Sequence, residues 1–165
     1  MSNAIAQLAA DVGKALKAAD YKLVTAESCT AGGLGFWITS VPGSSDWFDR
    51  GFITYSNQSK VDLLGVNPET INIHGAVSEQ TAHAMAEGAL KNSRADLAIA
   101  ITGIAGPDGG DTNKPVGTVW IACAGRGMAT IAEVDIYPGD RQAVRLGAIE
   151  RALQRVHTLL RSQSS

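Results

Sequence analysis

The segment Thr25-Ala26-Glu27-Ser28-Cys29-Thr30-Ala31-Gly32-Gly33 joins an apolar strand to an apolar helix through a glycine-containing turn. Residues 21–25 before the turn predict a buried strand, and residues 34–38 after it predict the start of a helix. Backbone N–H groups point outward at such a turn, so they can bind an oxyanion or a phosphate beside an exposed side chain. Ser28 and Cys29 are therefore candidate nucleophiles, although Ser28 or Thr30 could instead serve only as a helix cap.

Hydrophobic periodicity along the rest of the chain predicts an α/β fold. Asn57 and Asp140 are expected to cap helices, and residues 65–75 are expected to connect elements with at most one helical turn. Helices are predicted over 4–19, 57–64, 78–91 and from 141 onwards, and strands over 50–56, 96–102, 116–124 and 128–136.

Helices that separate the early strands imply parallel neighbours, whereas the last two strands are close enough in sequence to form a hairpin. We expect a three-layer α/β/α sandwich with a mixed, mostly parallel sheet of about five strands. Residues 1–165 are expected to form a single domain, of which only residues 162–165 fray.

Composition excludes several classes of protein. The 165 residues carry 14 basic and 16 acidic side chains, a net charge of −2, and no basic stripe, which disfavours a nucleic-acid surface. No apolar run approaches 18 residues and no signal sequence opens the chain, so we expect a cytoplasmic protein without a membrane segment. Cys29 and Cys123 make no disulfide framework and the three histidines show no zinc spacing, so we expect no metal.

Ser28 and Lys60 form the first candidate catalytic pair. Both follow predicted early strands, and ligand crevices of open α/β sheets lie beyond the carboxyl ends of the strands. A lysine kept neutral by burial can act as the base that a serine nucleophile needs, and Tyr55 could orient the amine. Taken singly, Lys60 also fits a solvated helix residue and Tyr55 a core residue.

Cys29 offers an alternative nucleophile in a set with Glu27 and Lys60. Neighbouring side chains on an extended turn point to opposite sides, so Ser28 and Cys29 are not expected to share one site. Packing in the core is the default role of a cysteine such as Cys29. His74 and His83 are alternative bases, but their positions in a loop and on a helix favour surface or capping roles.

The glycine-rich loop 103–115 forms a third constellation, with Thr102 before it and the turn at residues 139–141 after it. Its glycines allow close backbone approach to a ligand, and Arg141 supplies a planar cation, so together they predict phosphate binding. The loop has neither a Walker ending nor a dinucleotide fingerprint, and its glycines could equally serve turns alone.

Taken in order, these motifs and several others resemble the CinA C-terminal domain family over nearly the whole chain. The motifs are Thr25-Ala-Glu-Ser-Cys-Thr, Gly43-Ser-Ser, Arg50-Gly-Phe-Ile-Thr-Tyr-Ser-Asn, Lys60, His74-Gly-Ala-Val-Ser, Thr102-Gly-Ile-Ala-Gly-Pro-Asp-Gly-Gly, Lys114-Pro-Val-Gly-Thr-Val and Gly139-Asp-Arg. The resemblance implies a three-layer α/β/α sandwich, a homo-oligomer, and deamidation of nicotinamide mononucleotide to nicotinate mononucleotide and ammonia without a cofactor.

The resemblance also implies roles for residues. Ser28 is then the nucleophile, Lys60 the general base and Tyr55 its partner, while the pyridine nucleotide is the only partner molecule expected besides a second copy of the chain. The expected substrate-binding residues, which supply oxyanion donors, phosphate contacts or both, are Thr30, Ala31, Gly32, Gly33, Thr102, Gly103, Gly106, Gly109, Gly110 and Arg141.

Ala31 departs from the family pattern, which has glycine at this position. If the turn needs a positive φ here, alanine strains it and could displace the oxyanion donors, whereas alanine is harmless inside a helix. Two alternatives to the deamidase therefore stay open: a catalytically silent nucleotide-binding or regulatory module, and an acyl transferase that uses the same serine.

Overall fold

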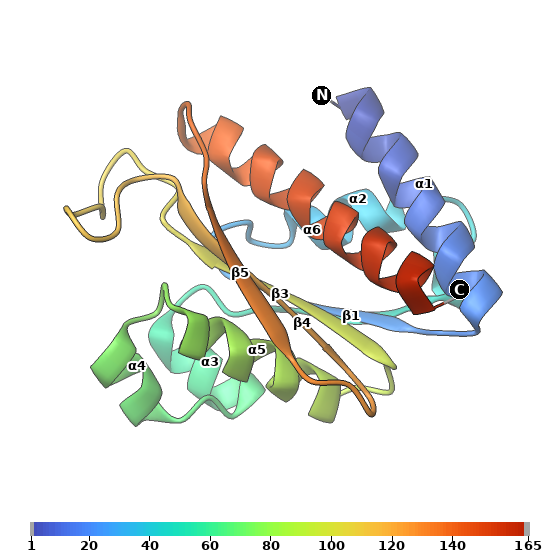
Figure 1. Cartoon of the computed structure of the whole chain (residues 1–165), viewed down its shortest axis with the longest axis horizontal. Coiled ribbons are helices and arrows are strands. Elements are labelled where there is room, and N and C mark those ends of the chain that lie inside the picture. The colour runs from blue at the N-terminus through green and yellow to red at the C-terminus, as the bar shows by residue number, and fades with distance from the viewer. Residues whose placement is uncertain (1, 164–165) are drawn as a thin grey trace.

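A five-stranded sheet separates two layers of helices in the computed structural model, which describes residues 2–163 (Figure 1). The elements are α1 (Ser2–Ala19), β1 (Leu23–Glu27), α2 (Gly33–Thr39), the 3-10 helix η1 (Ser44–Asp46), β2 (Phe48–Ile53), α3 (Asn57–Leu64), α4 (Pro68–His74), α5 (Glu79–Lys91), β3 (Leu97–Gly103), β4 (Thr118–Gly125), β5 (Ile131–Ile136) and α6 (Arg141–Gln163). The predicted three-layer α/β/α architecture is confirmed.

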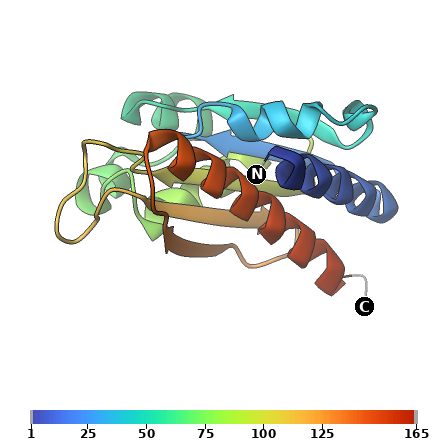
Figure 2. The ribbon, with the colours of Figure 1, turned by 90° about the horizontal axis from the view of Figure 1, so that it is seen from above.

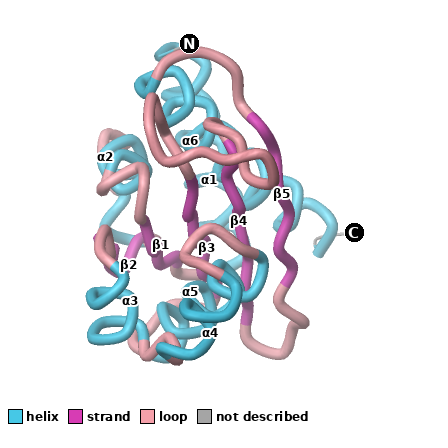
Figure 3. Tube along the Cα trace, turned by 90° about the vertical axis from the view of Figure 1, so that its left-hand side faces the viewer, coloured by secondary structure: helices cyan, strands magenta, loops and turns pink. Residues whose placement is uncertain are grey.

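The strands lie in the order β2-β1-β3-β4-β5, which can be followed from left to right in Figure 3. β1 pairs in parallel with β2 and β3, whereas β4 is antiparallel to both of its neighbours. Four strands therefore run in one direction, and the sheet is mixed and mostly parallel as predicted. Glu27 is level with Ile53 and Ile101, so β1, β2 and β3 end at one edge of the sheet.

Alternate strand residues enter two separate cores, because successive side chains point to opposite faces of a sheet. Leu23 and Ile99 pack with α1, α2 and α6, whereas Val24 and Ala98 pack with α3, α4 and α5. Figure 2 shows α1, α2 and α6 lying together on the first face. On the second face Gly88 of α5 lies so close to α3 that a side chain there would overlap the Leu64 carbonyl.

The structure corrects several predicted boundaries. Residues 68–74 form a helix of two turns, which the Asn67 side chain caps through the Glu69 N–H, rather than a loop with one turn. Ser56, not Asn57, caps α3, because Ser56 and Ser59 form a reciprocal capping box. Asp140 caps α6 as predicted, through the Ala143 N–H.

The end of α6 also differs from expectation. Residues 162 and 163 are helical rather than frayed, and residues 164 and 165 lie outside the described part of the chain. Within residues 2–163, the helices that reach 18 residues are too polar to cross a lipid bilayer.

Candidate active site

A buried carboxylate organises the turn that carries Ser28. Glu27, at the end of β1, is only 1% exposed and accepts hydrogen bonds from the Thr30 hydroxyl at 2.7 Å and from the Leu34 and Gly35 N–H groups at 2.8 and 3.0 Å. The N-cap residue Gly32 has no side chain to cap α2, so the strand residue supplies the acceptor instead. The turn is thus fastened to the sheet on one side and to α2 on the other.

Ala31 adopts the left-handed backbone conformation, with φ of 49°, and Gly32 follows with φ of 91°. The departure from the family pattern therefore falls at a position that favours glycine. The turn keeps its internal hydrogen bond despite this strain, since the Ala31 N–H donates to the Ser28 carbonyl at 3.0 Å.

Lys60 reaches Ser28 from α3. Its Nζ lies 3.0 Å from Ser28 Oγ and 2.9 Å from the Thr54 carbonyl oxygen, and the Tyr55 and Ser56 carbonyls are each 3.5 Å away. This contact joins residues 32 positions apart, because β1 and β2 end side by side and α3 starts directly after β2. The lysine and the serine predicted as a pair are therefore in contact.

Burial sets the electrostatics of this pair. Lys60 is 1% exposed, and loss of hydration lowers the pKa of its amine from the ordinary 10.5, against an opposing effect of Cys29. Among the ion pairs of residues 2–163, none involves Lys60, so no carboxylate restores the charged form. A neutral amine beside the Ser28 hydroxyl can accept its proton.

The same burial disfavours Cys29 as the nucleophile. Cys29 borders the same cavity as Ser28, contrary to the expectation that the two do not share a site. It is nevertheless only 6% exposed in the core beneath α1, α2 and α6, and burial raises the pKa of its thiol to about 11. Thiolate is the reactive form of cysteine, and it is scarce at neutral pH when the pKa lies so high. Glu27, the third member of the alternative set, is engaged with the turn and α2, as described above.

The Tyr55 side chain contacts Arg141 rather than the Lys60 amine that it was expected to orient. Its hydroxyl accepts a hydrogen bond from Arg141 Nη2 at 2.9 Å, and its contact with Lys60 comes from the backbone carbonyl instead of the phenol. Arg141 also donates through Nη1 to the Gly106 carbonyl at 2.8 Å. The tyrosine side chain thus positions the arginine that was predicted to contact the substrate.

Ser28 and Lys60 open into a cavity of about 290 Å³. Of the residues predicted to bind substrate, this cavity is lined by Thr102, Gly103, Gly106, Gly109 and Arg141. The Thr102 hydroxyl donates to the Ala76 carbonyl at 2.8 Å, so this side chain ties the segment before α5 to the end of β3.

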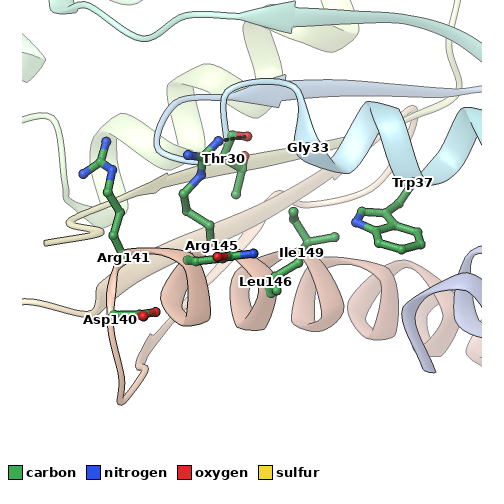
Figure 4. Close-up of a pocket in the computed structure, with 9 residues that line it drawn as sticks. Thr30, Gly33, Trp37, Asp140, Arg141, Arg145, Leu146 and Ile149 are labelled. Atoms are coloured by element: carbon green, nitrogen blue, oxygen red, sulfur yellow. Dashed lines mark hydrogen bonds between the residues drawn. The ribbon is translucent and has the colours of Figure 1, made fainter. Parts of the chain in front are cut away.

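A second cavity, of about 560 Å³, adjoins the first at Arg141 and is lined by Thr30 and Gly33 (Figure 4). Ala31, Gly32 and Gly110 line neither cavity. Ala31 and Gly32 instead shape the turn, and Gly110 packs against the backbone of Val116.

Sequence reasoning missed several polar side chains at these cavities, Asp140 and Gln142 of the second cavity among them. Asn57 and Asp108 line the catalytic cavity, and Arg145 lines the second one. Arg145 follows Arg141 by four residues on a predicted helix, a spacing that places both on one face and that could have revealed it.

The two histidines considered as alternative bases do not contact Ser28. His83 pairs with the Thr130 carbonyl at 2.9 Å, and His74 ends α4 outside both cavities. Within residues 2–163, no three His, Cys, Asp or Glu side chains gather in an arrangement that could hold a metal ion.

Comparison with known proteins shows the family of the chain. Residues 5–160 match the sequence profile of the CinA C-terminal domain family. The chain belongs to this family. It is 53% identical over 148 residues to the nicotinamide-nucleotide amidohydrolase PncC of Escherichia coli strain K12, with 90% of each chain covered.

Two further relatives extend the comparison. The PncC of Pseudomonas putida is 46% identical over 149 residues, covering 90% of this chain and 92% of its own. The crystal structure of the competence/damage inducible protein CihA from Agrobacterium tumefaciens superimposes with a TM-score of 0.92 at 43% identity, covering 94% of this chain and 95% of its own.

Proposed function

We propose that this chain hydrolyses the carboxamide of nicotinamide mononucleotide to nicotinate mononucleotide and ammonia, with Ser28 as nucleophile and Lys60 as base. Its kinship with nicotinamide-nucleotide amidohydrolases makes it an amidohydrolase. The observation that carries the proposed mechanism is the 3.0 Å contact between Ser28 Oγ and a buried amine with a lowered pKa.

Hydrogen-bond donors and acceptors around Lys60 fit this role. A neutral amine has two N–H groups and one lone pair. One N–H donates to the Thr54 carbonyl and the other faces the more distant carbonyls of Tyr55 and Ser56. The lone pair then faces the Ser28 hydroxyl, which makes serine the donor and lysine the acceptor, as general-base catalysis requires.

The reaction proceeds in two steps. Ser28 Oγ attacks the carboxamide carbon while Lys60 takes the hydroxyl proton, and the resulting ammonium returns that proton to the departing nitrogen, which leaves as ammonia. In the second step Lys60 takes a proton from water, which attacks the acyl carbon. The Lys60 ammonium then returns that proton to Ser28 Oγ as the ester bond breaks, which releases nicotinate mononucleotide and restores the serine hydroxyl and the neutral amine.

The turn supplies donors for the oxyanion of each tetrahedral intermediate. Within residues 2–163, the Thr30 N–H has no hydrogen-bond acceptor and the Cys29 N–H contacts only the thiol of its own residue, although both residues are buried beside Ser28. Such preorganised donors contribute about 10²–10³ in rate each. The Ser28 and Thr30 carbonyls accept hydrogen bonds from later N–H groups of the turn, and the Glu27 carboxylate accepts one from the Thr30 hydroxyl, so the donors are held in place.

A catalytically silent module is the weaker candidate. Its motivation was strain at Ala31, but the turn keeps its hydrogen bonds and Ser28 meets Lys60 despite φ of 49°. Self-association and a cytoplasmic location, implied by the family and by the composition, remain predictions. Light scattering on the purified protein tests the first.

An ammonia-release assay with nicotinamide mononucleotide tests the function. We expect activity from the wild type, loss of at least about 10³-fold in Ser28→Ala and Lys60→Met, and retention in Cys29→Ala. Circular dichroism verifies that each variant is folded. Ammonia release that survives Ser28→Ala refutes the serine mechanism, and product that forms only with an added amine or alcohol identifies an acyl transferase.

A further inference from the structure

The cavity between α2 and α6 lies directly beside the catalytic cavity. Thr30 borders it, only two residues after Ser28, so the Cα atoms of these residues are at most about 7.6 Å apart. Arg141 lines both cavities, which therefore meet at its side chain. A mononucleotide whose carboxamide lies at Ser28 can extend into this second space.

Arg145 presents unused hydrogen-bond donors to this space. It is half-buried and makes one long hydrogen bond, from Nη2 to the Thr30 carbonyl at 3.4 Å. A guanidinium has five N–H donors in a fixed fork that matches phosphate oxygens. Among the ion pairs of residues 2–163, none involves Arg141 or Arg145.

The two arginines point the same way. Figure 4 shows both side chains rising from the same side of α6, Arg145 to the turn at Thr30 and Arg141 to the left of it, with Asp140 below them at the start of the helix. One carboxylate oxygen of Asp140 is engaged in capping α6. Two like charges four residues apart repel each other, and an anion held between them relieves the repulsion.

The other side of the catalytic cavity is less suited to a phosphate. Asp108 lines it from the glycine-rich loop, and a carboxylate repels a phosphate but accepts hydrogen bonds from ribose hydroxyl groups. Asp140 also lines the cavity beside α6, but there two arginines, Arg141 and Arg145, outnumber the carboxylate. The balance of charge moves the expected phosphate position from the loop of residues 103–110 toward α6.

We propose that the cavity between α2 and α6 is the phosphate subsite of the enzyme, in which Arg145 acts with Arg141 to bind the 5′-phosphate of the substrate. Arg145 is then the residue that makes the enzyme select nucleotides over nucleosides. This inference rests on the proposed function for the identity of the substrate.

Comparing two substrates tests the role of Arg145. The kcat/KM for nicotinamide mononucleotide and for nicotinamide riboside, which lacks the phosphate, is measured in the wild type, Arg145→Met, Arg145→Lys and the control Arg126→Met on the distant β4–β5 hairpin. We expect Arg145→Met to lower the preference for the mononucleotide by about 10- to 100-fold, mainly through KM, as loss of a charge-assisted hydrogen bond does. Arg145→Lys recovers part of the preference, and Arg126→Met matches the wild type.

Equal losses on both substrates overturn the proposal, because they show that Arg145 acts only by supporting the turn at Thr30. An unchanged preference overturns it as well. If the wild-type protein releases ammonia from neither substrate, the proposed function is wrong. The phosphate subsite is then tested only by calorimetry of phosphate binding.

Binding of inorganic phosphate, measured by calorimetry, provides that independent readout. It also distinguishes a subsite for the phosphate group of the substrate from a separate site for free phosphate. We expect phosphate to bind the wild type, to bind Arg145→Met about 10-fold or more weakly, and to inhibit competitively against nicotinamide mononucleotide. Non-competitive inhibition identifies a separate effector site, and equal affinity for both proteins removes Arg145 from anion binding; either result overturns the proposal.

Discussion

Ala31 holds a backbone conformation that costs an alanine about 1 kcal/mol or more relative to glycine. Replacing it with glycine removes this strain, so Ala31→Gly is expected to raise the free energy of unfolding by about 1 kcal/mol and to keep amidase activity. Urea unfolding measures the change. The control Ala6→Gly, on the exposed face of α1, is expected to lower the free energy of unfolding by about 1 kcal/mol. If Ala31→Gly also destabilises the protein, Ala31 is not strained.

Lys60 gives activity and stability a predictable dependence on pH. Because catalysis needs the neutral amine, kcat/KM rises with pH and levels off above the lowered pKa of Lys60, below 10.5. In the window between that pKa and 10.5 the unfolded chain binds the proton more tightly, so the stability of the wild type relative to Lys60→Met also rises with pH.

Rate profiles and urea unfolding across this window check both trends. Lys91→Met, at the end of α5, is the control and follows the wild-type rate profile. A kcat/KM that falls as the pH rises through the same window rules out the neutral amine as the base.

At the scale of an element, Glu27 joins β1 to α2. Glu27→Ala leaves two backbone N–H groups and the Thr30 hydroxyl without their acceptor, so we expect it to lose about 2–4 kcal/mol of stability and most of the activity. Thermal unfolding and ammonia release measure the two effects. Glu79→Ala, in the exposed first turn of α5, changes stability by less than about 0.5 kcal/mol; an equally small effect of Glu27→Ala would falsify the capping role.

At the scale of the whole molecule, both thiols lie in the core that α1, α2 and α6 form on one face of the sheet. Burial raises the pKa to about 11 for Cys29 and to about 12 for Cys123. We therefore expect the native protein to resist iodoacetamide at pH 8 and to keep its activity, whereas guanidinium exposes two alkylation sites. Mass spectrometry counts the modified residues. If iodoacetamide rapidly labels Cys29 in the native protein and ammonia release is lost, Cys29 rather than Ser28 is the nucleophile.

The sequence by itself determined the layered fold, because the periodicity of apolar residues reports which face of each helix or strand is buried. It also placed Ser28 and Lys60 just after predicted early strands, since strand ends are marked by local changes of pattern. The helix at residues 68–74 was missed because its seven residues contain too few apolar side chains for a periodic signal, although Asn67 and Pro68 mark a helix start.

Only the tertiary structure decided which groups meet in the site. Register between β1 and β2, together with the packing of α3, brings Lys60 to Ser28. The packing of α6 pairs Arg141 with the Tyr55 hydroxyl and turns Arg145 toward the catalytic turn. A local pattern cannot specify contacts between side chains tens of residues apart, because these depend on how several elements pack at once. Burial, which lowers the pKa of Lys60 and raises that of Cys29, arises from the same packing and so distinguishes the base and the nucleophile from their neighbours.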